Sequence, residues 1–494
     1  MEISKRAYII FYIAIVALMS GYTLVSNQFF TYTLDDPYIH IQVAKNILKG
    51  TYGLNFGEFS APSSSILWPF VLAFVSALTP IPVEYIPLLL NFVFGGLTLY
   101  GVLLFTEKTF NKPLRNSMYL ILFFVLFAAG NLFGLIFNGM EHSLQLALVV
   151  WIVYFLLFKR SSSILYILLL LAPLVRYEDF AITVPLLFYL YVAGHKTKAI
   201  ATFSIAIVIV SLFSLFLYMH GLGLLPTSII IKTGAYSDSY ISNIVLKFFS
   251  NLSGSLTFTV LYIAAISSYI GRICKQKLLL YVIVSMTLHA FFGGTGWLYR
   301  YENYIVIYAA LMLVYLHKEL IAKYVDNYRY KLVIPLIAGV IFLNPGSIVT
   351  QIATATASKN IAQQQYRMGT LVKYLNQPVA ANDIGLVSLL GGNYVLDLYG
   401  LASKKAMQIR LSNDTSAMDE LVKKKGIRVI MIYSRWFKKI PKKWRKVAVL
   451  KSKGILISPI GREVSFYISN KDDSESAKRI MDISKKHSLG LEAL

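Results

Sequence analysis

Cysteine and charged residues are scarce in this 494-residue chain. It has one cysteine, Cys274, and charged residues make up 14% of the sequence. A single cysteine excludes an intramolecular disulfide and a thiolate metal site. The apolar content is 56%, and apolar runs near the ~20 residues that cross a bilayer recur from Ala7 to about Leu343. These features exclude a soluble globular protein and predict a polytopic membrane protein with a more polar tail.

Acidic residues are about half as common as basic ones, 24 against 47, so the net charge is +23. Such a charge can serve nucleic-acid binding, but here the cations lie in short loops between apolar runs and in the tail. The basic runs of the tail are Lys423-Lys424-Lys425, Lys438-Lys439 and Lys442-Lys443-Trp444-Arg445. They would face anionic lipid headgroups or phosphate-bearing glycolipids, or form a solvated surface. We therefore expect no nucleic-acid partner.

The Lys and Arg clusters constrain how often the chain crosses the membrane. Cytoplasmic loops are enriched in these residues, so an even number of spans should separate neighbouring clusters. The short run Ile66–Leu78, bounded by Pro62 and Pro80, is interpreted as a juxtamembrane or re-entrant helix. About eleven spans remain, with a cytoplasmic N-terminus and an uncleaved first span. They are Ala7–Val25, Tyr85–Phe105, Met118–Phe137, Leu144–Phe158, Ile164–Val175, Phe180–Val192, Ala199–Tyr218, Gly254–Ile270, Leu278–Phe292, Tyr304–Leu316 and Leu332–Leu343.

The predicted fold is an α-helical polytopic transmembrane domain followed by an extracytoplasmic α/β domain. The transmembrane domain covers residues 1–344 and includes a first external loop at 26–84, and the α/β domain covers 345–494. Short β-branched runs bounded by glycine predict strands in the tail. These runs lie near 379–385, 394–397 and 427–432, with a helix near 363–375.

Two adjacent acids, Asp35 and Asp36, follow the first predicted span by ten residues. Each charge raises the energy of the other, and both lose hydration near lipid. A substrate hydroxyl awaiting deprotonation, or a cation, would offset that cost. Capping of the amphipathic helix that runs from the pair to Gly50 explains one acid but not two. The pair therefore marks a candidate site, at the start of a helix expected to lie along the membrane interface.

Other polar groups fall on the same side of the membrane by this count. They are Glu141, His142, Arg176, Glu178, Lys232 and Arg300. Acids and bases that meet at one end of a helical bundle indicate a site, and solvated loop charges are the alternative. Asp383 and Asp397, at the ends of predicted strands, are interpreted as turn residues outside the site.

Four short motifs occur along the chain in a recognisable order. They are Asp35-Asp36-Pro37-Tyr38-Ile39, Gly139-Met140-Glu141-His142, Arg176-Tyr177-Glu178 and Asp383-Ile384-Gly385. Together they resemble polyprenyl-phosphate-dependent glycosyltransferases of the GT-C fold. The likeness is strongest to the bacterial branch of terminal β-(1→2) arabinofuranosyltransferases. His142 stands where that branch has Thr and Tyr177 where it has Pro, so the sugar stays open.

The resemblance implies an inverting hexosyl- or pentosyltransferase (EC 2.4 class) of cell-envelope biogenesis in the bacterial inner membrane. Its active site would be extracytoplasmic and use a polyprenyl-phosphate sugar. Asp35 is the expected base, and Asp36 would orient the acceptor or bind a divalent cation such as Mg²⁺, Mn²⁺ or Ca²⁺. Leaving phosphate needs positive charge, for which Arg300, then Lys232 and Arg176, are the candidates. Glu141 and Glu178 are a second acidic site.

The acceptor would be a glycan, a glycolipid or a protein. A transporter or flippase of lipid-linked saccharides is an alternative, but it predicts charges within spans and internal repeats, which this sequence does not display. A ligase or polymerase of such saccharides is another alternative. Those proteins carry their large external loop within the bundle, whereas the polar portion here follows the last span.

Overall fold

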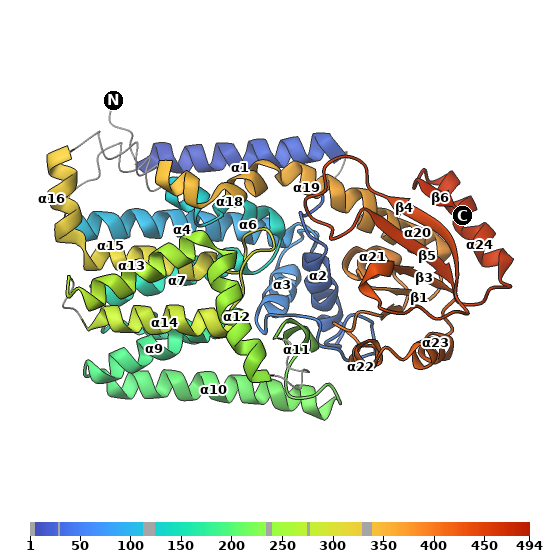
Figure 1. Ribbon diagram of the computed structural model, residues 1–494, viewed down its shortest axis with the longest axis horizontal. Coiled ribbons are helices and arrows are strands. Elements are labelled where there is room, and N and C mark those ends of the chain that lie inside the picture. The colour runs from blue at the N-terminus through green and yellow to red at the C-terminus, as the bar shows by residue number, and fades with distance from the viewer. Residues whose placement is uncertain (1–4, 28–29, 112–123, 234–239, 274–276, 329–337) are drawn as a thin grey trace. The chain divides into compact units, whose positions relative to one another are not determined.

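The computed structural model describes residues 5–27, 30–111, 124–233, 240–273, 277–328 and 338–494 (Figure 1). The protein is mostly helical, with one β-sheet near its C-terminus. It divides into two compact units, each built from three segments of the chain. The first unit is Met1–Leu18, Leu88–Leu212 and Tyr236–Ile352, and the second is Met19–Pro87, Phe213–Ala235 and Ala353–Leu494. The second unit thus joins the predicted external loop to the predicted C-terminal domain.

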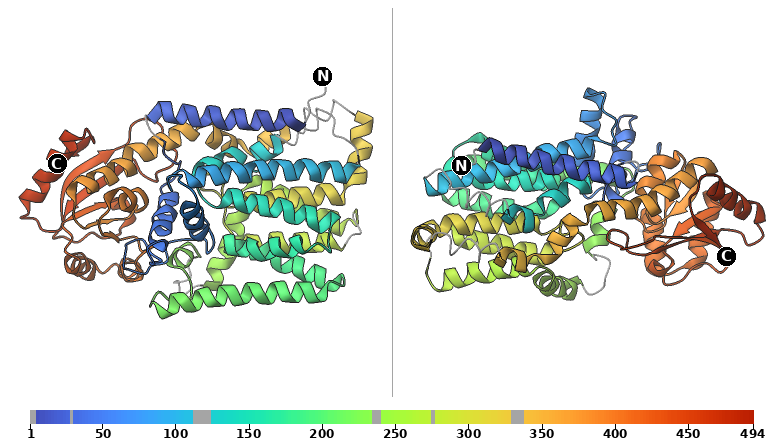
Figure 2. Two further views of the ribbon diagram at one scale, coloured as in Figure 1. Left: turned by 180° about the vertical axis from the view of Figure 1, so that it is seen from behind. Right: turned by 90° about the horizontal axis from the view of Figure 1, so that it is seen from above.

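The first unit is a bundle of apolar helices, several of which lie side by side (Figures 1 and 2). Helix α7 packs against α8 and α15, and α14 packs against α9, α13 and α15. The helices assigned wholly to this unit are α6 (Leu132–Asn138), α7 (His142–Phe158), α8 (Ser163–Val175), α9 (Phe180–Val192), α12 (Tyr240–Gly254), α13 (Leu256–Ile270), α14 (Leu278–Phe292), α15 (Asn303–Leu316), α16 (Lys318–Tyr328) and α18 (Pro345–Ile352).

The predicted number of eleven spans is not what the structure has. Within the described ranges, three helices are long and apolar enough to cross a membrane, or four if one bent pair is a single span. The three are found in α1 (Lys5–Asn27), α4 (Ile86–Phe110) and α10 (Lys196–Met219). Five of the other predicted runs, including Ile66–Leu78, are apolar helices of 10–17 residues. The sequence located these helices with nearly the observed bounds, but at 1.5 Å per residue helices of this length fall short of a ~30 Å bilayer core.

Two predicted spans extend beyond the described residues. Met118–Phe137 begins within the gap at 112–123, and Leu332–Leu343 begins within the gap at 329–337. The bent pair is α12 and α13, whose axes differ by 103°. Ser255 breaks the helix there, and its hydroxyl accepts a hydrogen bond from the Phe258 amide to cap α13. The sequence analysis missed α12 and treated the segment from Gly254 as a single span.

In the second unit, helix α2 (Asp36–Ile47) starts at the acid pair and packs against α3 (Trp68–Leu78). Gly50 ends the helical stretch with a φ of +85°, a conformation that glycine adopts without strain. The apolar face of α2, which was expected to meet the membrane interface, packs inside the protein. Ile39 and Val43 are buried in one cluster with Leu371 and Val387 of the C-terminal domain. Burial of such side chains is worth about 1.5–3 kcal/mol each, so this face fixes the helix to that domain.

The C-terminal domain contains a six-stranded sheet in the order β2-β1-β3-β5-β4-β6. Strands β1, β2 and β3 are parallel, and β5, β4 and β6 continue the sheet in antiparallel fashion. The strand bounds are β1 (Val379–Ala381), β2 (Val395–Asp397), β3 (Val429–Ile432), β4 (Arg445–Lys451), β5 (Glu463–Ile468) and β6 (Leu491–Ala493). The three predicted strands are confirmed as β1, β2 and β3, and the antiparallel half was not predicted.

Helices cover both faces of this sheet. Val379 and Ala381 of β1 face one hydrophobic cluster, while Ala380 faces the other. This alternation follows from the two-residue period of a strand. The first face is covered by α20 (Arg367–Leu375), α21 (Gly385–Gly391) and α24 (Ser474–Lys486), and the second by α22 (Lys404–Ser412) and α23 (Thr415–Lys424). The remaining helices of this unit are α11 (Thr227–Thr233) and α19 (Thr354–Ile361), with a π-helical turn η2 at Ala362–Tyr366.

Candidate functional site

The acid pair stands at the first turn of α2. Asp35 occupies the N-cap position and Asp36 the first helical residue, with Pro37 next. The Asp35 side chain makes no capping hydrogen bond to its own helix. Simple N-capping of α2, the alternative explanation for one acid, therefore does not account for Asp35.

The Asp35 carboxylate instead binds the start of another helix in the same unit. The backbone amide of Gly385 donates to Asp35 Oδ2 at 2.7 Å, and the amide of Leu386 donates to Oδ1 at 2.9 Å. These amides belong to the first turn of α21, which directly follows β1. Helix amino ends stabilise anions through such unpaired N–H groups. Both carboxylate oxygens are thereby fixed in one orientation.

Gly385 allows this approach because it has no side chain. A Cβ atom built there would lie 2.2 Å from the Asp35 carbonyl oxygen and 2.8 Å from Asp35 Cγ. Real carbon contacts do not reach such distances, so any larger residue would push Asp35 away. Glycine in the motif Asp383-Ile384-Gly385 is thus required by the close contact with the acid.

A third carboxylate, Asp383, adjoins this contact from the turn after β1. Its Oδ2 accepts a hydrogen bond from Gln365 Nε2 at 2.7 Å. The same Gln365 nitrogen donates to the Tyr433 hydroxyl at 3.0 Å, and that hydroxyl donates to Gln364 Oε1 at 2.7 Å. Asp383 is therefore held by a polar network inside the domain rather than exposed at a turn.

Burial and mutual repulsion raise the pKa of these acids. The pKa of Asp35 is raised mainly by burial and next by the charge of Asp383, against the opposing effect of the Gly385 and Leu386 amides. The pKa of Asp383 is also raised by burial, and Asp36 adds to the increase. The three carboxylates thus form one electrostatic group.

Asp383, which the sequence placed at a turn outside the site, belongs to this electrostatic group. Its signal was available in the Asp-Ile-Gly motif at the end of a strand, since loops at the carboxyl ends of parallel strands form sites. Asp397 differs from it. Its carboxylate accepts hydrogen bonds from the amides of Tyr399, Gly400 and Ala402 at 2.6–3.0 Å, so it organises the turn after β2, as expected for a strand-end residue.

A second polar cluster lies in the helical unit. Arg176, between α8 and α9, donates to Glu141 Oε1 at 2.7 Å and to Glu178 Oε1 at 2.5 Å. The Arg176 and Glu141 side chains are buried, and the guanidinium lies 5.5 Å from the ring centre of Tyr301. Three predicted site residues, distant in sequence, are brought into contact. Because two carboxylates compensate the Arg176 charge, the geometry favours a role in holding the cluster together.

The ion pairs of this cluster have a measurable consequence for stability. Replacing Arg176 with Gln should destabilise the protein by about 3–5 kcal/mol, because it leaves Glu141 buried without its cation. Thermal unfolding of the purified protein in lipid would measure the loss. The double variant Arg176→Gln/Glu141→Gln should recover part of it. Equal stability of Arg176→Gln and the natural protein would contradict a structural ion pair.

Arg300 follows a strained turn of the same unit. Gly296, Trp297, Leu298 and Tyr299 all have positive φ, between +45° and +83°. Left-handed backbone costs roughly 1–2 kcal/mol for each residue other than glycine. The Asn131 side-chain amide donates to the carbonyls of Leu298 and Tyr299 at 2.7 and 3.2 Å, and the Gly296 amide donates to the Glu302 carboxylate at 2.9 Å. Strain sustained in this way is typical of functional segments.

After this turn, the Arg300 side chain is buried inside the helical unit. Arg300 is 2% exposed, and its guanidinium lies 4.9 Å from the ring centre of Tyr301 and donates to the Tyr301 hydroxyl at 2.8 Å. Tyr301 also contacts Arg176 and the ring of His142, with ring centres 5.9 Å apart in the latter pair. Arg300 and the ion-pair cluster are thus connected through one aromatic ring.

The remaining predicted site features are only partly described. Lys232 belongs to α11, but its side chain lies outside the described part of the chain. Within the described ranges, no three His, Cys, Asp or Glu side chains are arranged to hold a metal ion. A requirement for a divalent cation therefore stays a prediction.

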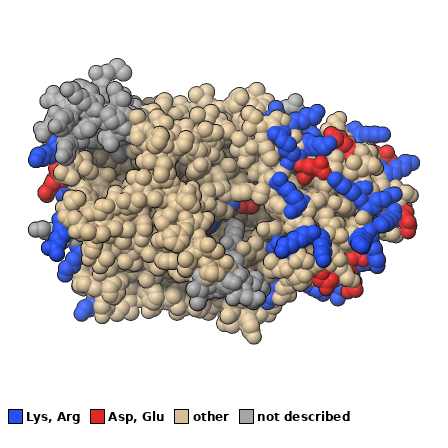
Figure 3. Space-filling model, in the orientation of Figure 1, with Lys and Arg blue, Asp and Glu red and all other residues tan. Residues whose placement is uncertain are grey.

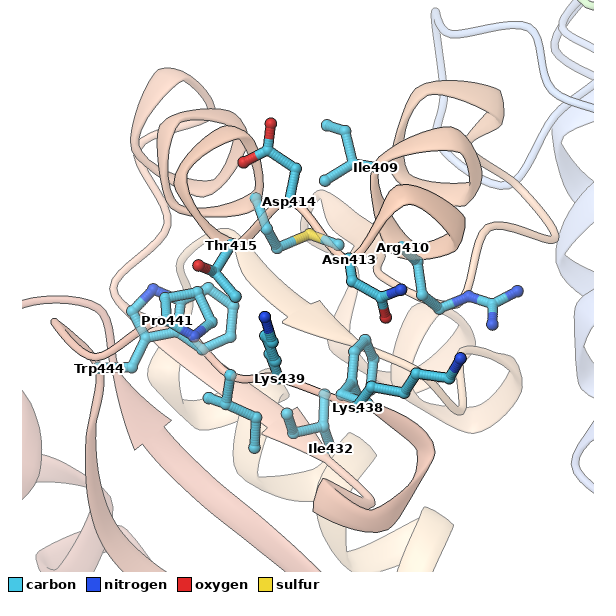
Figure 4. Close-up of a pocket in the computed structure, with 13 residues that line it drawn as sticks. Ile409, Arg410, Asn413, Asp414, Thr415, Ile432, Lys438, Lys439, Pro441 and Trp444 are labelled. Atoms are coloured by element: carbon cyan, nitrogen blue, oxygen red, sulfur yellow. The ribbon is translucent and has the colours of Figure 1, made fainter.

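A small pocket of the C-terminal domain lies apart from these groups (Figure 4). Trp444 and Pro441 border it on one side, and Arg410 and Lys438 on another. Its volume of about 20 Å³ corresponds to about one water molecule. It is too small for a sugar.

Comparison with known proteins supports the fold. Residues 359–467 match a family model described as "Domain of unknown function (DUF8728)". No curated protein matches the chain. The structure is similar to a crystal structure of the Archaeoglobus fulgidus oligosaccharyltransferase complexed with Zn and sulfate, with a TM-score of 0.50 and 12% identity. The similarity covers 89% of this chain and 72% of that one. The chain therefore shares the fold of that solved structure, and the predicted arabinofuranosyltransferase branch is not confirmed.

Proposed function

We propose that the protein is an inverting glycosyltransferase that moves a sugar from a polyprenyl-phosphate donor to a glycan, glycolipid or protein acceptor. The reaction would take place at the outer face of the membrane, where lipid-borne sugars are the available donors. The main support is the Asp35 carboxylate, which two backbone amides orient beside a second acid, Asp383. The likeness of the fold to an oligosaccharyltransferase supports the same class.

Asp35 is the proposed base. It takes the proton from an acceptor hydroxyl, whose oxygen forms a bond to the anomeric carbon while the bond to the donor phosphate breaks. The phosphate leaves with the electron pair of that bond. A carboxylate with a raised pKa is a stronger base, and its fixed orientation avoids reorganisation during the reaction. Asp36 would orient the acceptor or bind a divalent cation, as the sequence suggests.

Arg300 is the proposed ligand of the donor phosphate. Its planar guanidinium suits a phosphate, and the strained turn before it fixes its position. Lys232 stays a second candidate, and Arg176, Glu141 and Glu178 would support this region through their ion pairs.

The proposal is tested by reconstituting the protein in proteoliposomes with radiolabelled polyprenyl-phosphate sugars. We expect transfer to surface glycans extracted from cells that lack the protein, and mass spectrometry should show those glycans to be one sugar short. Unchanged glycans in such cells, together with no transfer from a panel of lipid-linked pentoses and hexoses, would contradict the proposal.

The charge of Asp383 should be visible in the pH dependence of transfer. Its charge raises the pKa of Asp35, so Asp383→Asn lowers that pKa and keeps the base deprotonated at lower pH. The acidic limb of the rate profile should move down by roughly one pH unit. Asp36, Tyr38 and Tyr433 also interact electrostatically with Asp35 and are unchanged in this variant.

Asp414→Asn is the matched control for this pH experiment. Asp414 caps α23 in the same domain, and asparagine caps helices equally well. Its profile should coincide with that of the natural protein. An acidic limb that Asp383→Asn does not move would separate Asp383 from the base.

A further inference from the structure

An open cleft of about 1020 Å³ lies at one end of the strands in the C-terminal domain. Three strand ends are aligned there, since Val429 at the start of β3 pairs with Ile468 at the end of β5, which pairs with Arg445 at the start of β4. Asp383 and Tyr433 follow the opposite, carboxyl ends of β1 and β3. The cleft and the acid group are therefore separate sites of one domain.

The lining of this basic cleft is strongly positive. Five cations and two carboxylates line it, an excess of three positive charges. The lining residues are Lys423, Gly426, Ile427, Arg428, Lys442, Lys443, Ser469, Asn470, Lys471, Asp472 and Asp473. Figure 3 shows that Lys and Arg gather over this domain, whereas the visible face of the helical unit has few charges.

Neighbouring acids compensate only part of this charge. Lys423 pairs with Asp419 at 2.8 Å, and Lys443 lies 4.0 Å from the same carboxylate. The other three cations are exposed and form no ion pair within the described residues; they are Arg428, Lys442 and Lys471. The cleft thus offers three cations without an ion pair to a ligand, of which Arg428 also interacts electrostatically with Asp473.

One of the two acids in the lining is already engaged. The Asp473 carboxylate accepts hydrogen bonds from the Ser476 amide at 3.0 Å and from its hydroxyl at 2.6 Å, which caps α24. Its charge serves the helix amino end, so it opposes an incoming anion less than an unengaged carboxylate would.

The composition of the lining narrows the class of ligand. Among the described residues, no aromatic side chain lines the cleft, so this lining lacks the stacking surface that single-stranded nucleic acids and neutral sugars use. Ile427 is the one larger apolar residue in the described part of the lining, so an acyl chain is not favoured. A volume of about 1020 Å³ far exceeds one phosphate, and a flat headgroup layer does not fill a concave cleft. These properties favour a discrete ligand with several anionic groups.

We infer that the basic cleft binds a polyanion of the phosphate class, such as a diphosphate or a chain of phosphodiesters. Three cations without an ion pair line it, and charge-assisted hydrogen bonds to phosphate oxygens are among the strong polar contacts. The inference does not rest on the glycosyltransferase proposal, because the cleft lies at the opposite end of the strands from the acid group.

The test is calorimetric titration of the full-length protein in phosphatidylcholine nanodiscs with inorganic tripolyphosphate. The variant Lys442→Gln/Lys471→Gln should bind at least about tenfold more weakly. The matched control is Lys478→Gln/Lys485→Gln, which removes two exposed lysines from α24 outside the cleft. The control should stay within about twofold of the natural protein.

Three outcomes would overturn the inference. Equal weakening by both double variants would show that net charge alone attracts the anion, and no heat of binding would exclude the site. Anionic phosphatidylglycerol in the nanodiscs should leave tripolyphosphate affinity unchanged, and its loss there would mean that membrane headgroups occupy the surface instead. Sugar transfer to a small acceptor should persist in Lys442→Gln/Lys471→Gln, which keeps this test distinct from that of the catalytic proposal.

Discussion

Replacement of Asp35 by Asn should lower the rate of sugar transfer by about 10²–10⁴-fold, the usual contribution of a general base. Asparagine has nearly the same shape but cannot accept the hydroxyl proton. The rate would be measured with purified protein in lipid and a radiolabelled polyprenyl-phosphate donor. Full turnover by this variant would remove Asp35 from the mechanism.

The design must separate loss of the base from loss of the contact with α21. Asparagine keeps one acceptor oxygen but turns an NH₂ group toward one of the two amides of Gly385 and Leu386. That exchange should cost about 1.5–3 kcal/mol of stability. Thermal unfolding measures this cost, and binding of the donor lipid shows whether the site survives. Retained donor binding with lost turnover assigns the defect to the base.

Gly385→Ala should produce a comparable loss of activity, about 100-fold or more, without changing any ionisable group. The new Cβ would meet the Asp35 carbonyl oxygen at 2.2 Å, so the acid must leave the two amides that orient it. The sheet should stay folded, since the affected contact lies at the first turn of α21 rather than in a strand. The measurement is the same transfer assay, with circular dichroism to verify the fold.

Gly96→Ala serves as the control for a glycine-to-alanine change. Its Cβ would lie 3.6 Å from Tyr12, an ordinary contact, and Gly96 is within helix α4. We expect natural activity and equal or slightly higher stability from the better helix propensity of alanine. If Gly385→Ala behaved like this control, the position of Asp35 would not depend on α21.

Local signals in the sequence located most elements of the fold. The helices at His142–Phe158, Ser163–Val175 and Phe180–Val192 match the predicted runs to within two residues, because charged or breaking residues bound each apolar run. The polar character of residues 240–254 hid helix α12. The run Leu278–Phe292 matches helix α14 in its bounds, but its 15 residues are fewer than the ~20 that cross a bilayer, so counting it as a span was the weak step. The sequence pattern showed that α2 has an apolar face, but it did not show that this face packs against the C-terminal domain.

For the candidate site too, features formed by neighbouring residues could be predicted from the sequence, whereas contacts between distant residues could not. The adjacent acids Asp35 and Asp36 stand out in the sequence because the repulsion between them is unfavourable unless a ligand or a structural contact offsets it. The contact between Asp35 and Gly385 could not be predicted, since it joins positions 350 residues apart. The strained turn before Arg300 could not be predicted either, because residues such as Trp and Leu, found at 297 and 298, rarely adopt a positive φ.

The same contact sets an order of events during biosynthesis. Ribosomes add about 5–20 residues per second, so roughly 20–70 s separate the synthesis of Asp35 from that of its amide partners 350 positions later. Throughout that interval Asp35 lacks the two backbone amides that orient its carboxylate in the folded protein. A message truncated before β1 would therefore yield a protein that has its apolar helices but an unplaced carboxylate, and such products should be inert rather than partly active.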